Sequence, residues 1–225
     1  MARTKTATGS RQFVWDAPTR LFHWLLVGLV GFSWWSARTH HMDWHQLSGL
    51  AVCGLLVFRV LWGFLGAGTA RFRQFVRGPR AIWAYLRGRA PRTVGHNPLG
   101  GLSVIALLLA LSAQIVSGLL AVDIDGVESG PLSYLVDFEQ GRLAAQVHAL
   151  SFKAVQALVG LHVLAIGFYL VARRRNLTGA MITGFETGRE AEPVPVPQGR
   201  WQALALAVAV AVLLAVWIAK GGHWP

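Results

Sequence analysis

Cysteine, acidic side chains and charge in general are scarce in this chain, and each scarcity excludes a class of protein. One cysteine among 225 residues allows no intrachain disulfide and no cysteine-based metal centre. Only 14% of the residues are charged and 54% are hydrophobic, which fits an integral membrane protein better than a soluble domain. Basic residues outnumber acidic ones by 21 to 10, but they fall in blocks between apolar runs. Because no basic face interleaved with aromatic residues results, the charge pattern argues against nucleic-acid binding.

Long apolar runs dominate the sequence instead. A hydrocarbon core of roughly 30 Å needs about 20 apolar residues in a helix. The first run follows a basic start, but no small-residue cleavage pattern comes after it, so we expect a retained span and not a signal peptide. The fold class predicted is therefore an all-α membrane protein. Its expected spans cover residues 21–37, 44–66, 98–122, 145–172 and 201–219.

The basic residues also predict an orientation, because cytoplasmic loops are rich in Lys and Arg. Residues 1–20, 67–97 and 173–200 carry 16 of the 21 basic residues, and with five spans these segments lie on one side. The opposite loops contain most of the acids. We therefore expect a multi-pass membrane protein with its N-terminus in the cytoplasm and its C-terminus on the outer side.

Within the basic loop, the stretch "GPRAIWAYLRGR" predicts a short helix that begins at Pro79. Its apolar residues share one side and arginines surround them, so it is either an interfacial helix or a solvated loop helix.

Four of the eight histidines lie in or at the ends of expected spans: His23, His45, His148 and His162. Ionisable residues within a membrane are rare and usually functional, although a single one can simply hydrogen-bond another helix. His148 and His162 are fourteen residues apart, which places them on one helix face at a separation of about 21 Å. By depth, His45 matches His148 at the outer level, and His23 matches His162 at the inner level.

Paired imidazoles at two depths suit two six-coordinate haems held between facing helices. Zinc fits less well, because a zinc site needs three or four ligands at one level. The inner pair matches imperfectly, since His23 lies close to the start of its span. Either the fourth span projects beyond the membrane or the first span starts earlier.

Other residues give weaker signals. Arg59 lies fourteen residues after His45 on the same face, where it either neutralises a haem propionate or extends to the cytoplasm. Lys153 is a poorer candidate at the outer level, because it points away from His148. Several glycines in the spans either admit a flat macrocycle or allow close helix packing: Gly28, Gly31, Gly49, Gly54, Gly118, Gly160 and Gly167.

These residues make the chain similar to the bacterial cytochrome b-561 family, which is related to the cytochrome b subunit of nickel–iron hydrogenase and the gamma subunit of formate dehydrogenase. The matching stretches occur in family order between about residues 12 and 184. They are "VWDAPTRLFHWLL", "WHQLSGLAVCGLLVFRVLWGFLG", "RFRQFVRGPRAIWAYLRG", "GHNPLGG", the pair His148 and His162, and "RRRNLTGAMITG".

The resemblance implies a four-helix bundle over residues 1–184 that holds two b-type haems. The ligand pairs it implies are His45 with His148 and His23 with His162. It also implies a quinone site near the inner haem, at Asn97 and His96, although Asn97 equally fits a helix cap before Pro98. Residues 185–200, a Pro-rich cytoplasmic linker, and the extra helix at 201–219 depart from the family, and they either dock a partner or stabilise an oligomer.

The function predicted from these features is respiratory electron transfer across the membrane, between a periplasmic redox protein and the quinone pool. The periplasmic partner would be a c-type cytochrome or a dehydrogenase or hydrogenase subunit. A stand-alone superoxide:quinone oxidoreductase, with Lys153 and Arg142 near the outer haem, is the first alternative. A haem-free transporter or membrane scaffold is an alternative of another class.

Overall fold

The computed structural model describes residues 11–66, 68–89, 95–125, 128–187 and 200–223. Five long helices form the bundle: α1 (Ala17–Arg38), α2 (Met42–Leu65), α5 (Pro98–Leu120), α6 (Phe138–Val171) and α8 (Trp201–Ala219). The short elements are β1 (Arg11–Phe13), η1 (Gly68–Ala70), α3 (Phe72–Phe75), α4 (Pro79–Leu86), η2 (Ser133–Leu135), α7 (Leu177–Thr183) and β2 (Phe185–Thr187). The all-helical fold class is therefore confirmed, with one small addition, a two-stranded antiparallel ribbon of β1 and β2.

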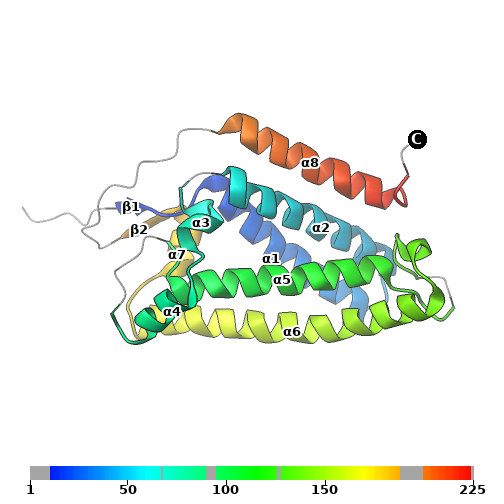
Figure 1. Cartoon of the computed structure of the whole chain (residues 1–225), viewed down its shortest axis with the longest axis horizontal. Coiled ribbons are helices and arrows are strands. Elements are labelled where there is room, and N and C mark those ends of the chain that lie inside the picture. The colour runs from blue at the N-terminus through cyan, green and yellow to red at the C-terminus, as the bar shows by residue number, and fades with distance from the viewer. Residues whose placement is uncertain (1–10, 67, 90–94, 126–127, 188–199, 224–225) are drawn as a thin grey trace, which may run out of the picture.

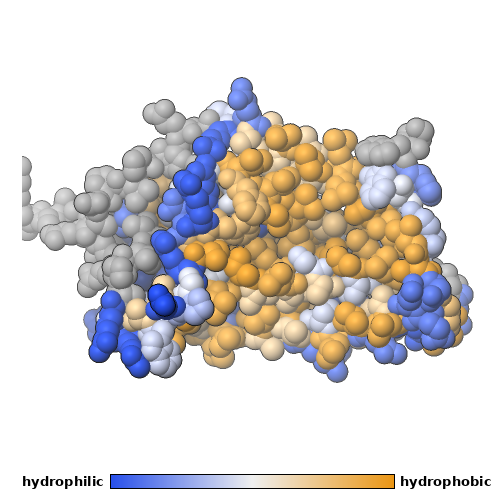
Figure 2. Space-filling view, in the orientation of Figure 1, coloured by the Kyte–Doolittle hydropathy of each residue, from blue (hydrophilic) through white to orange (hydrophobic). Residues whose placement is uncertain are grey.

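The long helices lie side by side, with α3, α4, α7 and the ribbon gathered at one end of the bundle (Figure 1). We call this end the basic end, because its segments carry the arginines of residues 71–89 and 173–175. The opposite end, which contains η2 and residues 123–139, is called the acidic end. A broad apolar band covers the visible face of the bundle, and polar residues lie towards its two ends (Figure 2). This distribution is typical of a helical membrane protein.

Among the described residues, four helices are long and apolar enough to cross a bilayer: α2, α5, α6 and α8. Helix α1 has 22 residues but is not one of them. It carries Arg20 and His23 in its first two turns and serines further along, which lower its apolar character. That α1 also crosses the membrane stays a prediction.

Polar caps determine where two of the helices begin. Asp16 accepts a hydrogen bond from the Thr19 amide at 2.9 Å, so α1 starts at Ala17, four residues before the expected span. Asp137 and Gln140 form a capping box, so α6 starts at Phe138 and has 34 residues, a length of about 51 Å. The earlier start of α1 gives His23 six residues of helix before it, which reduces the mismatch in depth with His162.

The helices pack mainly as pairs. Close backbone contacts join α1 to α2, α5 to α6 and α2 to α8, and α5 also contacts α2. Between the described residues, no comparable contact joins α6 to α1 or to α2. The histidines predicted to pair therefore belong to helices whose backbones stand apart, so that side chains or a group between them must fill the space.

Helix α8 packs against α2 through small side chains. Ala207 and Ala211 are buried in a cluster with Phe58 and Trp62 of α2. Arg200, the residue before α8, donates a hydrogen bond at 2.8 Å to the carbonyl of Leu65, the last residue of α2. The linker expected over residues 185–200 begins with strand β2, and residues 188–199 lie outside the described part of the chain.

Candidate functional site

The structure brings His45 of α2 and His148 of α6 together near the acidic end. Their ring centroids lie 6.0 Å apart and the ring planes are nearly perpendicular, at 85°. Since a metal–nitrogen bond is about 2 Å long, two imidazoles on opposite sides of one metal ion have centroids roughly 6 Å apart. The distance between these two rings therefore fits the space that a shared haem iron requires.

Both outer histidines are held through the same ring nitrogen. Nδ1 of His45 lies 2.9 Å from the Ser33 carbonyl oxygen, and Nδ1 of His148 lies 2.8 Å from the Gln114 carbonyl oxygen. A carbonyl can only accept, so each Nδ1 donates its proton and each neutral ring keeps a lone pair on Nε2. Metal-ligating histidines are commonly oriented in this way, by donating the other ring N–H to a backbone carbonyl.

Helix α5 supports the ring of His148 at two further points. The Gln114 side-chain amide nitrogen lies 3.0 Å from Nε2, and the Ser151 hydroxyl donates to the Gln114 amide oxygen at 2.5 Å. A Cβ at Gly118 would lie 2.6 Å from Cε1 of His148, so only glycine leaves room for this ring. Sequence reasoning missed Gln114, because a glutamine in an apolar helix has no periodic signal.

The inner pair is less directly joined. His23 of α1 and His162 of α6 lie near enough for their charges to interact, but the described residues show no ring contact between them. Nδ1 of His23 is buried and has no hydrogen-bond partner among the described residues. A buried polar atom without a partner is costly, and such an atom in a native structure commonly marks a missing group. These two rings thus fit a site completed by a bound cofactor.

Two neighbours of His23 fix its position on α1. Arg20 donates to the Ile182 carbonyl at 2.5 Å, and the Trp24 indole N–H donates to the Met181 carbonyl at 3.3 Å. Both carbonyls belong to α7, about 160 residues further along the chain. The stretches "PTRLFHW" and "GAMITG" are therefore joined by hydrogen bonds, which hold the start of α1 at the level of His162.

Arg59 lies inside the bundle near the basic end. Its side chain is 3% exposed, donates to the Ala70 carbonyl at 3.2 Å, and lies over the ring of Phe72 at 5.1 Å. Of the two alternatives for Arg59, extension to the cytoplasm is wrong, because two phenylalanines of α3 cover the guanidinium. Within the described residues Arg59 forms no carboxylate ion pair. A cation so placed fits an anionic group that approaches from the bundle interior.

His96 lies close to Arg59, in the segment before α5. Its ring packs edge-on against Trp15 with 4.5 Å between centroids, and against Phe75 with 4.7 Å. Burial, together with the positive charges of Arg59 and His162, lowers the pKa of His96 to about 3. The imidazole is therefore neutral at physiological pH and is held in an aromatic environment.

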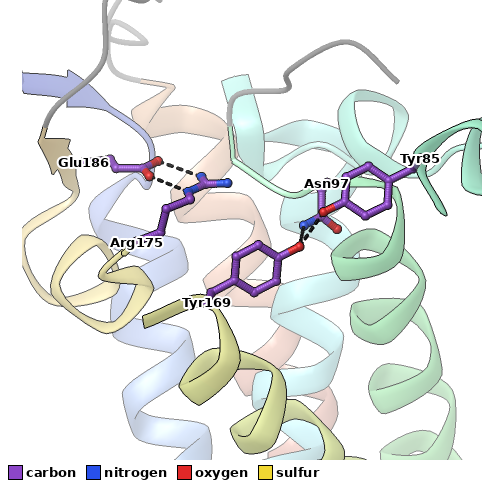
Figure 3. A network of polar contacts seen from close by, with 5 residues as sticks. All are labelled: Tyr85, Asn97, Tyr169, Arg175 and Glu186. Atoms are coloured by element: carbon purple, nitrogen blue, oxygen red, sulfur yellow. Dashed lines mark hydrogen bonds and ion pairs between the residues drawn. The ribbon is translucent and has the colours of Figure 1, made fainter. Parts of the chain in front are cut away.

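Asn97 caps α5, as the second interpretation of its sequence position predicts. Its side-chain oxygen accepts from the Gly100 amide at 2.7 Å. Its amide nitrogen donates to the Tyr169 hydroxyl at 2.6 Å, and that hydroxyl lies 2.5 Å from the Tyr85 hydroxyl. Figure 3 shows these three side chains converging from α5, α6 and α4. Neither tyrosine was singled out from the sequence, because tyrosines at helix ends are ordinary interfacial residues.

The glycines differ in what surrounds them. Gly54 faces Ala211 and Ala215 of α8, and Gly118 faces His148, so these two allow close packing of protein groups. A Cβ added at any of the other five would meet nothing within 4 Å: Gly28, Gly31, Gly49, Gly160 and Gly167. These five positions leave room for a cofactor or for lipid.

Of the two cations considered for superoxide chemistry, Arg142 donates to the Val122 carbonyl at 3.0 Å and is held in the acidic-end loop. Lys153 is exposed on α6. Neither is directed at the pair of His45 and His148 by any contact in the described residues.

The fold and these contacts define a class of protein: a helical membrane protein with two imidazoles, His45 and His148, brought together near one end of the bundle. A family model described as "Prokaryotic cytochrome b561" matches residues 14–184, about three quarters of the chain, and the chain therefore belongs to this family. No curated protein and no solved structure gives a significant match. The chain is thus a membrane b-type cytochrome of electron transfer, and its family implies b-type haem. Helix α8 lies outside the matched range.

Proposed function

We propose that the protein holds two b-type haems and transfers electrons across the bacterial inner membrane, between a periplasmic redox protein and the quinone pool. The observation that carries this proposal is the outer pair, in which two imidazoles lie 6.0 Å apart and each is oriented by a hydrogen bond from Nδ1 to a backbone carbonyl. Nε2 of His148, which the Gln114 amide contacts at 3.0 Å, would exchange this contact for the iron. A protein that used these histidines as proton relays would have no need of two rings held through Nδ1 at this spacing.

Each histidine has a defined task in this proposal. His45 and His148 would hold one haem near the acidic end, and His23 and His162 would hold the other nearer the basic end. When bound, the haems supply one-electron redox chemistry. The protein contributes the spacing, since His148 and His162 are about 21 Å apart along α6. It also fixes the tautomer of each outer histidine, through the hydrogen bond from Nδ1 to a backbone carbonyl.

Arg59 would balance the charge of a haem propionate at the inner level. A buried guanidinium is stable only when its charge and its donors are compensated. Among the described residues Arg59 has one acceptor, two aromatic rings and the charge of Asp16 nearby. A carboxylate from the cofactor would complete this compensation.

The proposed orientation places the basic end in the cytoplasm and the acidic end in the periplasm. Helix α4 supports this orientation, because Trp83 and Leu86 are exposed beside arginines, as expected of a helix at a lipid headgroup layer. The acidic end would then meet the periplasmic redox partner, and the five acids of residues 123–139 would favour a partner with a basic surface.

The proposal is tested with single histidine variants of the full chain in membranes. We expect about two haems per chain in the wild type, and about one in both His148→Ala and His162→Ala, with different remaining redox potentials. His223→Ala, which changes a histidine near the C-terminus, serves as the control and should keep both haems. Two full haems in either ligand variant would contradict the proposed pairs, and a colourless folded wild type would contradict haem binding itself.

A further inference from the structure

Three polar side chains from three separate elements meet at the basic end, on the side of α6 that carries His162. They are Tyr85 of α4, Asn97 at the cap of α5 and Tyr169 of α6 (Figure 3). All three are partly buried. The remaining labelled residues of the figure, Arg175 and Glu186, form a two-pronged ion pair at 2.8 and 3.0 Å.

Counting donors and acceptors in this cluster leaves one proton over. The Asn97 amide donates to the Tyr169 oxygen, so that oxygen is an acceptor in the bond. The two phenols share a second bond, which uses one of their two hydroxyl protons whichever group donates. Within the part of the chain that the structure describes, no acceptor for the other hydroxyl proton is present. The cluster therefore offers one hydrogen-bond donor to a group outside the protein.

The cluster lies where an electron acceptor of the inner level would bind. Tyr169 follows His162 by seven residues, which is two helical turns, so both side chains lie on one face of α6 about 10 Å apart along the axis. Arg175 fixes the ring of Tyr169, since its guanidinium lies 5.8 Å from the ring centroid while Glu186 holds it from β2. Tyr85 keeps its proton, because burial and its hydrogen bond to Tyr169 raise its pKa to about 12.

We propose that the Tyr85–Tyr169 pair donates the hydrogen bond that holds a carbonyl oxygen of the quinone head group, and conducts a proton to it from the cytoplasmic surface. This inference rests on the proposed function, which supplies the quinone and the electrons. Asn97 then positions Tyr169 by donating to its oxygen, and does not itself contact the quinone, because both ends of its amide are occupied.

Reduction of one quinone to quinol takes up two electrons and two protons. The electrons arrive singly from the inner level of the cytochrome. One proton passes from a phenol to the quinone oxygen, that phenol regains a proton through its partner from cytoplasmic water, and the second proton comes directly from water. In the reverse direction, quinol oxidation returns the protons by the same route.

The competing explanation is a structural clamp, in which the tyrosines only join α4 to α5 and α6. The experiment compares Tyr169→Phe and Tyr85→Phe with Tyr134→Phe in the full haem-loaded chain. Tyr134 is the remaining one of the three tyrosines and stacks on His223 at the acidic end, so it is a matched control. The measurements are haem content, equilibrium binding of a short-chain ubiquinone to the oxidised protein, and reoxidation of the reduced protein by that quinone in H2O and D2O.

We expect all variants to keep the wild-type haem content. Tyr169→Phe should bind the quinone about tenfold more weakly, the loss expected for one good hydrogen bond. Tyr85→Phe should slow reoxidation and reduce the solvent isotope effect, and Tyr134→Phe should behave as the wild type. If Tyr169→Phe and Tyr85→Phe both kept the wild-type affinity for the quinone and the wild-type reoxidation rate, the inference would be overturned. A lowered thermal stability in these variants would then support the structural clamp. A wild-type protein that the quinone does not reoxidise would instead contradict the proposed function, so the two failures can be told apart.

Discussion

The contact between Gly118 and His148 allows a sharp test of how the outer site is built. A Cβ at position 118 would lie 2.6 Å from Cε1 and 2.8 Å from Nδ1 of His148, closer than non-bonded atoms approach. The ring cannot move freely, because Nδ1 is bound to the Gln114 carbonyl at 2.8 Å. In Gly118→Ala the ring must therefore tilt, and the hydrogen bond that orients the ligand weakens.

The expected change in global stability is small, because two effects oppose each other. Overpacking costs about 1–3 kcal/mol, whereas replacing a helical glycine by alanine returns about 1 kcal/mol. The displacement of the ring is local, so we expect Gly118→Ala to lose most of the outer haem and to keep the inner one. Haem-to-protein ratio and a redox titration resolved into two components measure this outcome.

Gly54→Ala is the matched control. It is the same substitution in a long helix, but its new Cβ would make ordinary contacts at 3.6 Å with Ala211 and Ala215 of α8. Gly54 is nine residues from His45 and so lies on the opposite face of α2. Two haems with unchanged potentials in Gly118→Ala would refute the reasoning, because they would show that the ring of His148 tolerates a methyl group beneath it.

Two further predictions follow from the basic end and from α8. The pKa of His96 is lowered to about 3 in the folded chain and is about 6.5 in an unfolded chain. Below pH 6.5 the unfolded chain therefore binds a proton at His96 that the folded chain does not bind. As the pH falls from 6 to 3, His96 should therefore lower the free energy of unfolding by about 1.4 kcal/mol for each pH unit. In His96→Gln, thermal unfolding scans should show a weaker loss of stability over this pH range. If His96→Gln lost as much stability between pH 6 and 3 as the wild type, this prediction would be contradicted. Ending the chain after residue 187 removes α8 from the face of α2 opposite His45, so we expect both haems to remain and the midpoint of unfolding to fall by roughly 5 °C. Loss of haem in that variant would show that α8 supports the ligands.

Much of the helical framework could be predicted from the sequence, because a bilayer imposes a length and a composition on each span. The helices α2, α5 and α8 begin and end within about two residues of the predicted spans. Depth along the expected spans also predicted that His45 pairs with His148, whose ring centroids lie 6.0 Å apart. Depth was less reliable for His23, because the Asp16 cap extends α1 by four residues that hydropathy alone does not reveal.

The remaining features depend on contacts between segments distant in sequence, which no local pattern specifies. The hydrogen bond from Arg20 to Ile182 joins residues 162 positions apart, and the one between Tyr85 and Tyr169 joins residues 84 apart. Arg59 shows the same difficulty, because its position on α2 fits both a buried and a solvent-reaching side chain. Only the rings of α3, folded back over α2, decide that it is buried.

The two levels of the bundle are stabilised in different ways, and this difference bears on how the cofactors would be inserted. The outer rings are fixed by carbonyls of neighbouring helices, so the geometry of His45 and His148 exists before a cofactor binds. At the inner level the positions of the helices are fixed instead, through the bonds of Arg20 and Trp24 to α7, while Nδ1 of His23 has no partner in the part of the chain that the structure describes. A preformed site loses less conformational entropy on binding than one that orders its ligands. The outer site should consequently bind haem more tightly than the inner site, although both use two histidines. When the protein is loaded with less haem than it can hold, the component of the redox titration that His148→Ala removes should therefore appear before the one that His162→Ala removes.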